Sequence, residues 1–462
     1  MKLVYDVEEK PKFGKVLVYA FQQLLAILAA TIAVPAITGN GMSMAAALFG
    51  AGVGTLVYVL FTKAKSPVFL GSSFAFLGSM AAAFAGAVSA QAGFAGLIIG
   101  AAFAGLVYVI IALVIKVAGV AWIDKLMPKQ VIGPTVAIIG LSLAGNAVGD
   151  LQTTAAVVAE GAPAPAPYFA VLVGVITLLV VCGASVYGNK SMKLIPFIIG
   201  IVIGFAIAAV LTVIGTKKGI DSLILCDFSA FENMSAIAVP EFTFVEAFKG
   251  FKEVDGAYIA SIAVAYIPVA LVVFAEHLAD HKNISSIIER DLLVEPGLHR
   301  TLLGDGVGSM VGAFFGGCPN TTYGESVACV AITRNASVIT IICTAVLAMA
   351  ISFVGPFVTF LGAIPKCVMG GVCMSLYGFI AVSGLKMIKN VDLEDNRNLF
   401  VVSVILIAGI GGLSLTFGKV TITTIACALI LGIVFNLILS AGDKIRLPKD
   451  ARDRAEAEGK EI

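Results

Sequence analysis

Charge is scarce in this sequence. Of its 462 residues only 13% are charged, whereas 59% are hydrophobic and the mean hydropathy is +1.02. About a quarter of the residues in a soluble domain are charged, so the composition excludes an ordinary soluble protein. The formal net charge of +1 gives no reason to expect nucleic acid as a partner. Several apolar windows approach the roughly 20 residues that cross a bilayer as a helix, which predicts an all-α polytopic membrane protein surrounded by lipid.

Motifs of secreted, catalytic and metal-binding proteins are also missing. The opening "MKLVYDVEEKPKFGK" lacks the apolar core of a signal peptide, so the first apolar helix is expected to stay in place. The eight cysteines form no C-x-x-C pair, and no serine or glycine loop has the context of a nucleophile elbow or a phosphate site. His277 and His281 are four apart, but without H-E-x-x-H or a third ligand zinc is a weak alternative. We therefore expect no metal, no cofactor and no enzyme.

About fourteen apolar segments divide the sequence. The first seven fall near 14–38, 43–62, 67–83, 93–115, 130–148, 168–187 and 194–215, and the others near 256–279, 302–316, 322–333, 336–355, 367–385, 398–415 and 420–440. Segments 67–83 and 322–333 are short for helices that span a bilayer. A connection at 217–255 separates the two sets, and a polar cytoplasmic tail is expected at 442–462.

Most basic residues in the short loops lie on one side of this arrangement, with Lys366 and Lys419 as isolated exceptions. With the beginning of the chain inside, each predicted inner loop carries lysine or arginine, among them Lys63, Lys125, Lys190, Arg290 and Arg334. The predicted outer loops 39–42, 84–92, 149–167 and 317–321 carry neither. Cytoplasmic loops of membrane proteins are enriched in both, so we expect both termini in the cytoplasm and a location in the cell membrane.

The sequence also resembles itself. "PKQVIGPTVAIIGLSLAG", from Pro128, is similar to "PKCVMGGVCMSLYGFIAVSG", from Pro365, and "GSSFAF", from Gly71, is similar to "NTTYGE", from Asn320. Because each half has an odd number of segments, the halves must face opposite ways across the membrane. This pattern predicts an inverted repeat of residues 1–216 and 256–441, an architecture of transporters in which paired short segments mark the binding site.

Both short segments begin with residues that continue a helix poorly: Pro67, Gly71, Ser72 and Ser73 in one, and Pro319, Asn320, Thr321 and Thr322 in the other. Non-helical backbone at membrane depth is tolerated only where it is buried in protein or lines a cavity. Each break should lead into a half-helix whose free N–H groups point into that cavity. Such a site suits a solute with carbonyl oxygens or negative charge; the alternative is a small-residue packing motif between helices.

Three carboxylates lie in otherwise apolar surroundings. Glu325 follows the second break, and Glu276 and Asp280 share one helical face at a spacing of four. Burying an unpaired charge in a membrane is expensive, so such residues are functional candidates, and a carboxyl group in a low-dielectric site can exchange a proton. For Glu325 the alternative is a structural partner of a helix end or an arginine. For Glu276 and Asp280 it is the polar inner end of their segment.

Together these motifs resemble the nucleobase–ascorbate transporter family, also called nucleobase:cation symporter-2, and are most similar to its bacterial uracil permeases. The resemblance runs almost end to end and is strongest in "FLGSSFAFLG", "AEHLADHKNISSIIERDLLVEPGLHRTLLGDGVGSMVGAFFGG" and "CPNTTYGESVACVAITRN". It implies about 14 transmembrane segments in a 7+7 inverted repeat, with core and gate domains each assembled from both repeats. It also implies short strands at broken segments 3 and 10.

The resemblance assigns roles to individual residues. It implies that Glu276 and Glu325 bind a planar base, that the backbone N–H groups of Phe74 and Gly324 meet its carbonyl oxygens, and that Tyr323 packs near it. Proton coupling would fall to the two glutamates with Asp280 and Tyr377, as residues that bind the proton or support the acidic network. The family also implies a homodimer formed through the gate domains.

Three departures from the family pattern bear on the substrate. Asp280 stands where uracil permeases commonly have histidine, as it does in purine-transporting relatives. Ser326 and Ala328 replace the usual asparagine and glycine, and Gln23 replaces a histidine. We predict a secondary transporter that imports uracil by proton symport, with Na⁺ as the other candidate coupling ion. The alternatives are a xanthine or purine permease of the same family and an anion transporter of the same fold.

Overall fold

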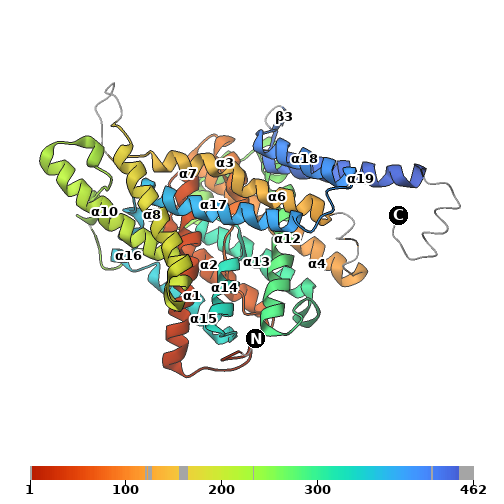
Figure 1. The fold of residues 1–462 in the computed structure, drawn as a ribbon, viewed down its shortest axis with the longest axis horizontal. Coiled ribbons are helices and arrows are strands. Elements are labelled where there is room, and N and C mark those ends of the chain that lie inside the picture. The colour runs from red at the N-terminus through yellow and green to blue at the C-terminus, as the bar shows by residue number, and fades with distance from the viewer. Residues whose placement is uncertain are drawn as a thin grey trace.

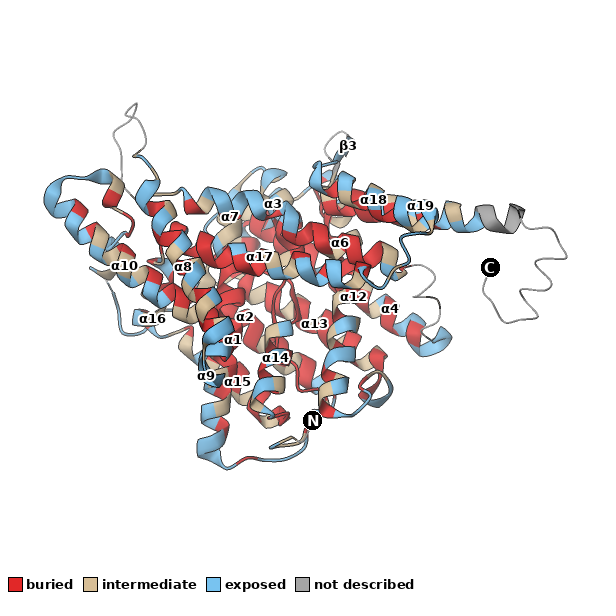
Figure 2. Ribbon diagram, in the orientation of Figure 1, coloured by how far each residue is buried: buried red, intermediate tan, exposed pale blue. Residues whose placement is uncertain are grey.

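The computed structural model is a helical structure with two short two-stranded sheets. It describes residues 3–119, 122, 127–155, 165–232, 234–417 and 420–446, so residues 447–462 of the predicted tail lie outside the described residues. Within the described part of the chain, nine helices are long and apolar enough to cross a membrane. Buried residues lie in the interior where the helices meet, as the colouring of the ribbon in Figure 2 shows.

The helices follow the predicted windows. The first half holds α1 (Phe13–Thr38), α2 (Met44–Phe61), α3 (Leu77–Ala85), α4 (Ala90–Ala118), α6 (Lys129–Ser142), α7 (Ala144–Leu151), α8 (Tyr168–Tyr187), α9 (Lys190–Leu194) and α10 (Pro196–Lys218). The second holds α12 (Gly256–Ile288), η5 (Leu293–Gly297), α13 (Leu298–Gly316), α14 (Gly324–Thr333), α15 (Val338–Ile351), α16 (Gly355–Gly362), α17 (Lys366–Ile388), α18 (Asn396–Ile410) and α19 (Thr424–Arg446). The connection contains η2 (Asp221–Leu223), η3 (Ser229–Phe231), α11 (Thr243–Gly250) and η4 (Phe251–Glu253). Each window overlaps a helix; that all fourteen segments cross the membrane stays a prediction.

The two short segments are broken as expected. The first consists of strand β1 (Leu70–Ser72), the 3₁₀ turn η1 (Phe74–Phe76) and α3, and the second of strand β2 (Asn320–Thr322) and α14. The strands pair antiparallel, with Leu70 opposite Thr322 and Ser72 opposite Asn320. The predicted strands are therefore confirmed. The sequence did not indicate the second hairpin, β3 (Leu415–Phe417) with β4 (Val420–Ile422).

Side chains of α2 and α13 complete the hydrogen bonding of the strands. The hydroxyl of Thr55 on α2 accepts from the Leu70 N–H at 2.9 Å, and that of Ser309 on α13 accepts from the Asn320 N–H at 2.9 Å. Backbone groups at membrane depth must find partners within the protein. Helices at matching places of the two halves do this in the same way, which supports the predicted repeat.

Glycines let α2 and α13 cross closely behind the strands. A Cβ added to Gly50 would lie 2.3 Å from the carbonyl oxygen of Gly312, and one added to Gly54 would lie 2.7 Å from that of Gly308. Only small residues allow helix backbones to approach this closely. The glycines scattered through the sequence thus set the position of the helices that hold both strands.

The helices form two groups, as Figure 1 shows. Along the upper and left part, α17 packs on α6, α7 and α8, α18 packs on α6 and α19, and α10 packs on α8. In the lower part, α2 packs on α13 and α15, and α1 packs on α14 and α15. The second group carries both strands. This division supports the predicted gate and core domains, which remain proposals.

Candidate functional site

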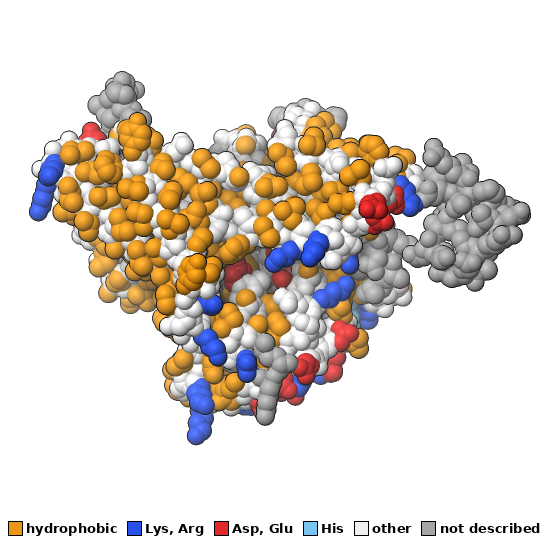
Figure 3. Space-filling model, viewed as in Figure 1, with side chains coloured by type: hydrophobic (Ala, Val, Ile, Leu, Met, Phe, Trp, Pro, Cys, Tyr) orange, Lys and Arg blue, Asp and Glu red, His pale blue; other side chains and the backbone are white. Residues whose placement is uncertain are grey.

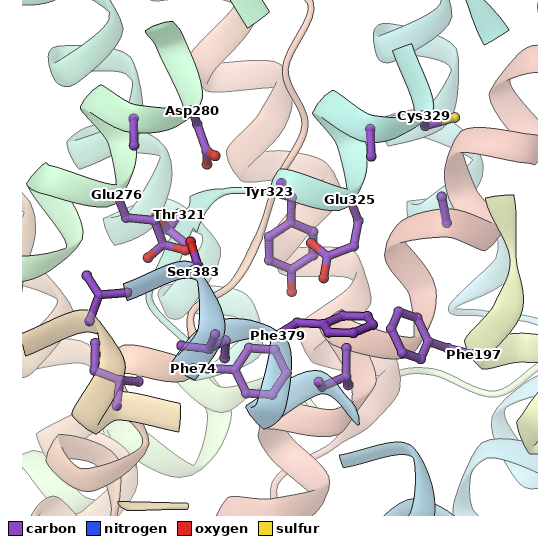
Figure 4. Close-up of a pocket in the computed structure, with 18 of the residues that line it drawn as sticks. Phe74, Phe197, Glu276, Asp280, Thr321, Tyr323, Glu325, Cys329, Phe379 and Ser383 are labelled. Atoms are coloured by element: carbon purple, nitrogen blue, oxygen red, sulfur yellow. The ribbon is translucent and has the colours of Figure 1, made fainter. Parts of the chain in front are cut away.

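A cavity of about 420 Å³ lies between the two groups of helices. One wall comes from α1, β1, η1, α12, β2 and α14, and the other from α6, α8, α9, α10 and α17. Figure 3 shows acidic side chains in a hollow of the molecular surface, with basic side chains nearby. Figure 4 shows residues that line the cavity. Among the described lining residues Lys193 is the only basic one, whereas Glu276, Asp280 and Glu325 are acidic.

The three carboxylates come from two elements. Glu276 and Asp280 project from α12, and Glu325 projects from the first turn of α14, with Tyr323 between the two glutamates in Figure 4. All three side chains are partly buried and line the cavity. Because α12 continues to Ile288, Glu276 and Asp280 do not lie at the end of their helix. The structure therefore brings together the acidic residues that the sequence singled out.

Asp280 joins α12 to the second broken segment. The hydroxyl of Thr322 on β2 donates to Asp280 Oδ2 at 2.7 Å. A Cβ added to Gly324 would lie 3.9 Å from Asp280 Oδ1, so this carboxylate also faces the start of α14. A charge-assisted hydrogen bond of this kind is stronger than one between neutral groups. Asp280 is therefore held beside the strand rather than left free in the cavity.

Tyr323 ties the second broken segment to the first. Its hydroxyl donates to the carbonyl oxygen of Ser72 at 2.9 Å, and its ring covers Gly71. A Cβ added to Gly71 would lie 2.3 Å from that ring, so only glycine fits there. The predicted place of Tyr323 at the site follows from this packing.

Phe74 and Tyr377 meet edge to face at the cavity wall. Phe74 lines the cavity, and its ring centroid lies 6.0 Å from that of Tyr377, with the rings at 79°. Tyr377 is buried on α17 and is absent from the described lining. Among the described residues it makes no hydrogen bond to a carboxylate, so its predicted support of the acidic network stays a prediction.

The start of α14 offers backbone donors to the cavity. Gly324 and Glu325 are its first two residues, both line the cavity, and no side chain caps this end of the helix. The first N–H groups of a helix have no intrahelical acceptor, and the helix dipole places partial positive charge there. An acceptor such as a carbonyl oxygen can therefore bind at this end.

Sequence reasoning missed a buried network behind α12. His277 Nδ1 lies 2.7 Å from Asp305 Oδ2, and His277 Nε2 lies 3.0 Å from the Thr301 hydroxyl. His281 Nε2 lies 2.7 Å from the hydroxyl of Tyr58. The two histidines, weighed above as a zinc pair, instead bind neighbouring helices, and no group of three possible metal ligands occurs in the part of the chain described. The signal was their position one residue after Glu276 and Asp280, which turns them out of the cavity.

Two departures from the family pattern contact each other. Gln23 Nε2 donates to the hydroxyl of Ser326 at 2.5 Å, and that hydroxyl also accepts from the N–H of Phe69 at 3.0 Å. Ser326 is buried on α14 directly after Glu325. The sequence showed each substitution separately, but only the structure shows that they form one pair between α1 and α14.

Known proteins match the chain along most of its length. The model of a family described as the permease family matches residues 14–418. The chain is 37% identical to the uracil permease of Bacillus caldolyticus over 441 residues, which cover 95% of each chain. It is 32% identical to the uracil permease of Escherichia coli K12 over 454 residues, which cover 98% of this chain and 97% of that one.

Solved structures share the fold at low sequence identity. The transmembrane domain of the cyanobacterial bicarbonate transporter BicA matches with a TM-score of 0.60 at 14% identity, over 94% of this chain and 99% of that one. The inward-facing murine anion transporter Slc26a9 matches with a TM-score of 0.62 at 12% identity, over 94% of this chain and 70% of that one. These similarities extend to the fold alone.

Proposed function

Since the chain belongs to the nucleobase–ascorbate transporter family, an integral membrane family of transporters rather than enzymes, we propose that it imports uracil by proton symport. The relatives named above are uracil permeases that align over nearly their whole length, which supports uracil as the substrate. We place the protein in the cell membrane with both termini in the cytoplasm, as the distribution of basic residues predicts.

The observation that carries the proposal is the chemistry of the cavity. Carboxylates on α12 and α14 face the same space as the uncapped start of α14. Uracil has ring N–H donors and carbonyl acceptors, and carboxylate oxygens and helix N–H groups are the matching partners. In this proposal Glu276 and Glu325 accept from the ring, the N–H groups of Phe74 and Gly324 donate to its carbonyls, and Tyr323 packs beside it.

The acidic residues also supply a reason for proton coupling. Glu276, Asp280 and Glu325 line one partly buried cavity, where like charges repel strongly. Each proton that binds there reduces this repulsion. We propose that a proton enters with the base, that Asp280 and Tyr377 support the two glutamates, and that both solutes leave together. Na⁺ is the other candidate coupling ion.

The position of the cavity suits alternating access. Its walls belong to the two helix groups, which we propose to be a core domain (α1–α4 and α12–α15) and a gate domain (α6–α10 and α17–α19). Each contains elements of the proposed repeats 1–216 and 256–441, joined by the connection 217–255. Rocking of one group against the other would expose the site to each side in turn. A homodimer through the gate domains stays a prediction.

One observation favours a second substrate class. Asp280, which the family pattern associates with purine transport, lines the cavity, and because Thr322 binds its Oδ2, its Oδ1 can meet a base directly. A xanthine or purine permease is therefore the second candidate. The fold shared with anion transporters is weaker support, because three carboxylates in the cavity oppose binding of an anion.

Uptake of labelled uracil into proteoliposomes tests the proposal. An inward proton gradient should stimulate uptake, a sodium gradient should not, and excess xanthine should leave uptake unchanged. Accumulation of xanthine without uracil would establish the purine alternative. Stimulation by a sodium gradient alone would show that Na⁺, and not H⁺, is the coupling ion. If neither base is taken up, the proposed substrate class is wrong.

A further inference from the structure

The segment Leu3–Glu9 crosses the ends of both helices that carry the carboxylates. It runs beside the connection between α14 and α15, with Tyr5 bridged in parallel to Asn335. Five hydrogen bonds hold it there: Val4 N–H (2.8 Å) and Tyr5 N–H (3.4 Å) to Arg334 O, Ala336 N–H to Tyr5 O (2.9 Å), Val338 N–H to Val7 O (3.0 Å) and the Ser337 hydroxyl to Glu9 O (2.6 Å). These contacts begin directly after the last turn of α14, so the segment holds the far end of the helix that starts at Gly324.

The same segment holds the end of α12. Arg290, two residues beyond α12, donates from Nη2 to Asp6 Oδ2 at 2.6 Å. Val7 is only 1% exposed and shares a hydrophobic cluster with Ile284 and Ile288 of α12 and with Val330 of α14. The ion pair is exposed and contributes little on its own. Val7 is therefore the buried residue of Leu3–Glu9, within the cluster that also contains residues of α12 and α14.

Backbone conformation indicates that both helix ends depend on their surroundings. The residues that follow α12 and α14, Glu289 and Arg334, have φ of +55° and +58°. Residues other than glycine rarely adopt this left-handed backbone conformation, which persists where surrounding contacts hold it. The carbonyl oxygen of Arg334 is the acceptor for the Val4 N–H, so the segment binds one of these two residues directly.

We propose that Leu3–Glu9 is a brace that sets the spacing between the carboxylates of α12 and the carboxylate of α14. Glu276 and Asp280 lie on one braced helix, and Glu325 lies on the other. Near the cavity the bond between Thr322 and Asp280 joins α12 to β2, two residues before α14 begins, and at their far ends the two helices are joined by the brace. Groups that grip one small ligand must be held to within about 0.5 Å, so loosening one end weakens binding. This inference rests on the proposed function, because it concerns the affinity for uracil.

A matched pair of proline substitutions tests the brace. Val4→Pro removes the shorter of the two N–H donors to Arg334 O and leaves only that of Tyr5, at 3.4 Å; Val4 itself is 51% exposed. Ala238→Pro is the control, because it removes the N–H that donates to Phe353 O in the connection between α15 and α16, which carries no site residue. We expect Val4→Pro to raise the Kd for uracil about tenfold and Ala238→Pro to change it less than about twofold. Val7→Asn, which disrupts the buried contact instead, should act like Val4→Pro.

Hydrogen exchange gives a readout that does not depend on the substrate. Exchange in residues 280–289 and 324–333 should speed up in Val4→Pro and Val7→Asn but not in Ala238→Pro. If neither exchange there nor Kd differs from the control at equal loss of thermal stability, the segment only stabilises the fold and the brace is wrong. If the unmodified protein binds no uracil, the proposed function fails, and the exchange measurement alone decides the brace.

Discussion

The two broken segments share one backbone plan but differ in chemistry. Each has a short strand that leads into a helix, and the strands pair with each other. The similarity of "GSSFAF" and "NTTYGE" pairs Phe76 with Glu325. The equivalent hydrogen bonds of Leu70 and Asn320 shift the pairing by one residue, so the counterpart of Glu325 is Ala75, which lines the cavity without a polar group. Phe76 is 2% exposed and stacks on Tyr266 of α12, with ring centroids 5.5 Å apart, whereas Glu325 faces the cavity.

The difference shows how two segments with similar backbones can form one site for a small substrate. The first segment contributes packing and, in the proposed function, the N–H of Phe74, whereas the second also contributes the carboxylate and the hydroxyl that holds Asp280. A cavity with the same acid on both segments would gather still more like charge in a low-dielectric space. The repeat therefore positions the backbone, while the unequal side chains determine the site.

The largest effect should come from the packing residue of the first segment. Phe76→Ala leaves a void against Tyr266 and should lower the free energy of unfolding by about 3–5 kcal/mol. The thermal unfolding midpoint in detergent measures this loss. Whatever folded protein remains should keep its dependence on the proton gradient, because Phe76 lies outside the described cavity lining. Loss of coupling in well-folded protein would contradict the division of roles.

The next largest effect concerns transport alone. Glu325→Gln keeps the size of the side chain but removes its proton exchange, and loss of a charged hydrogen bond costs about 2–3 kcal/mol. Gradient-driven uracil uptake should therefore fall by about 100-fold at unchanged thermal midpoint. Glu394→Gln, at an exposed position outside the helices, is the control and should transport normally. Normal pH-dependent uptake by Glu325→Gln would remove Glu325 from the mechanism.

A pair of glycine substitutions should show that the two broken segments differ in how much room they leave for a side chain. Gly71→Ala forces its Cβ into the ring of Tyr323 and should cost about 1–3 kcal/mol of stability. Gly324→Ala meets only Asp280 Oδ1, at 3.9 Å, and should leave the thermal midpoint close to that of the unmodified protein. Equal midpoints for the two variants would show that the packing of Tyr323 on Gly71 is not a constraint.

The smallest effect should come from the hydroxyl that holds Asp280. Thr322→Val keeps the shape of the strand residue and removes a hydrogen bond that contributes about 1–2 kcal/mol. Uracil affinity should fall about tenfold, measured by equilibrium binding, and competition by xanthine should change because Asp280 is released. Unchanged affinity and competition would mean that Asp280 takes no part in recognising the base.

Much of the fold and site could be predicted from local sequence. Hydrophobic windows indicated the helices, and the clusters around Pro67 and Pro319 indicated the breaks, because proline, glycine and short polar residues are poor at continuing a helix. Glu276, Asp280, Glu325 and Tyr323 were singled out and do come together at one cavity. The hairpin β3–β4 was missed, because residues 415–422 lie in and between windows that were assigned to helices.

The sequence by itself determined that this chain enters a membrane, where it breaks its helices and which acids it buries, because composition and helix breaking are local properties. Only the tertiary structure decided which distant groups meet. Thr322 reaches Asp280, Gln23 reaches Ser326, and the histidines turn away from the cavity towards Asp305 and Tyr58. Hydrogen bonds act over about 3 Å, and which side chains come that close depends on how whole helices cross and rotate.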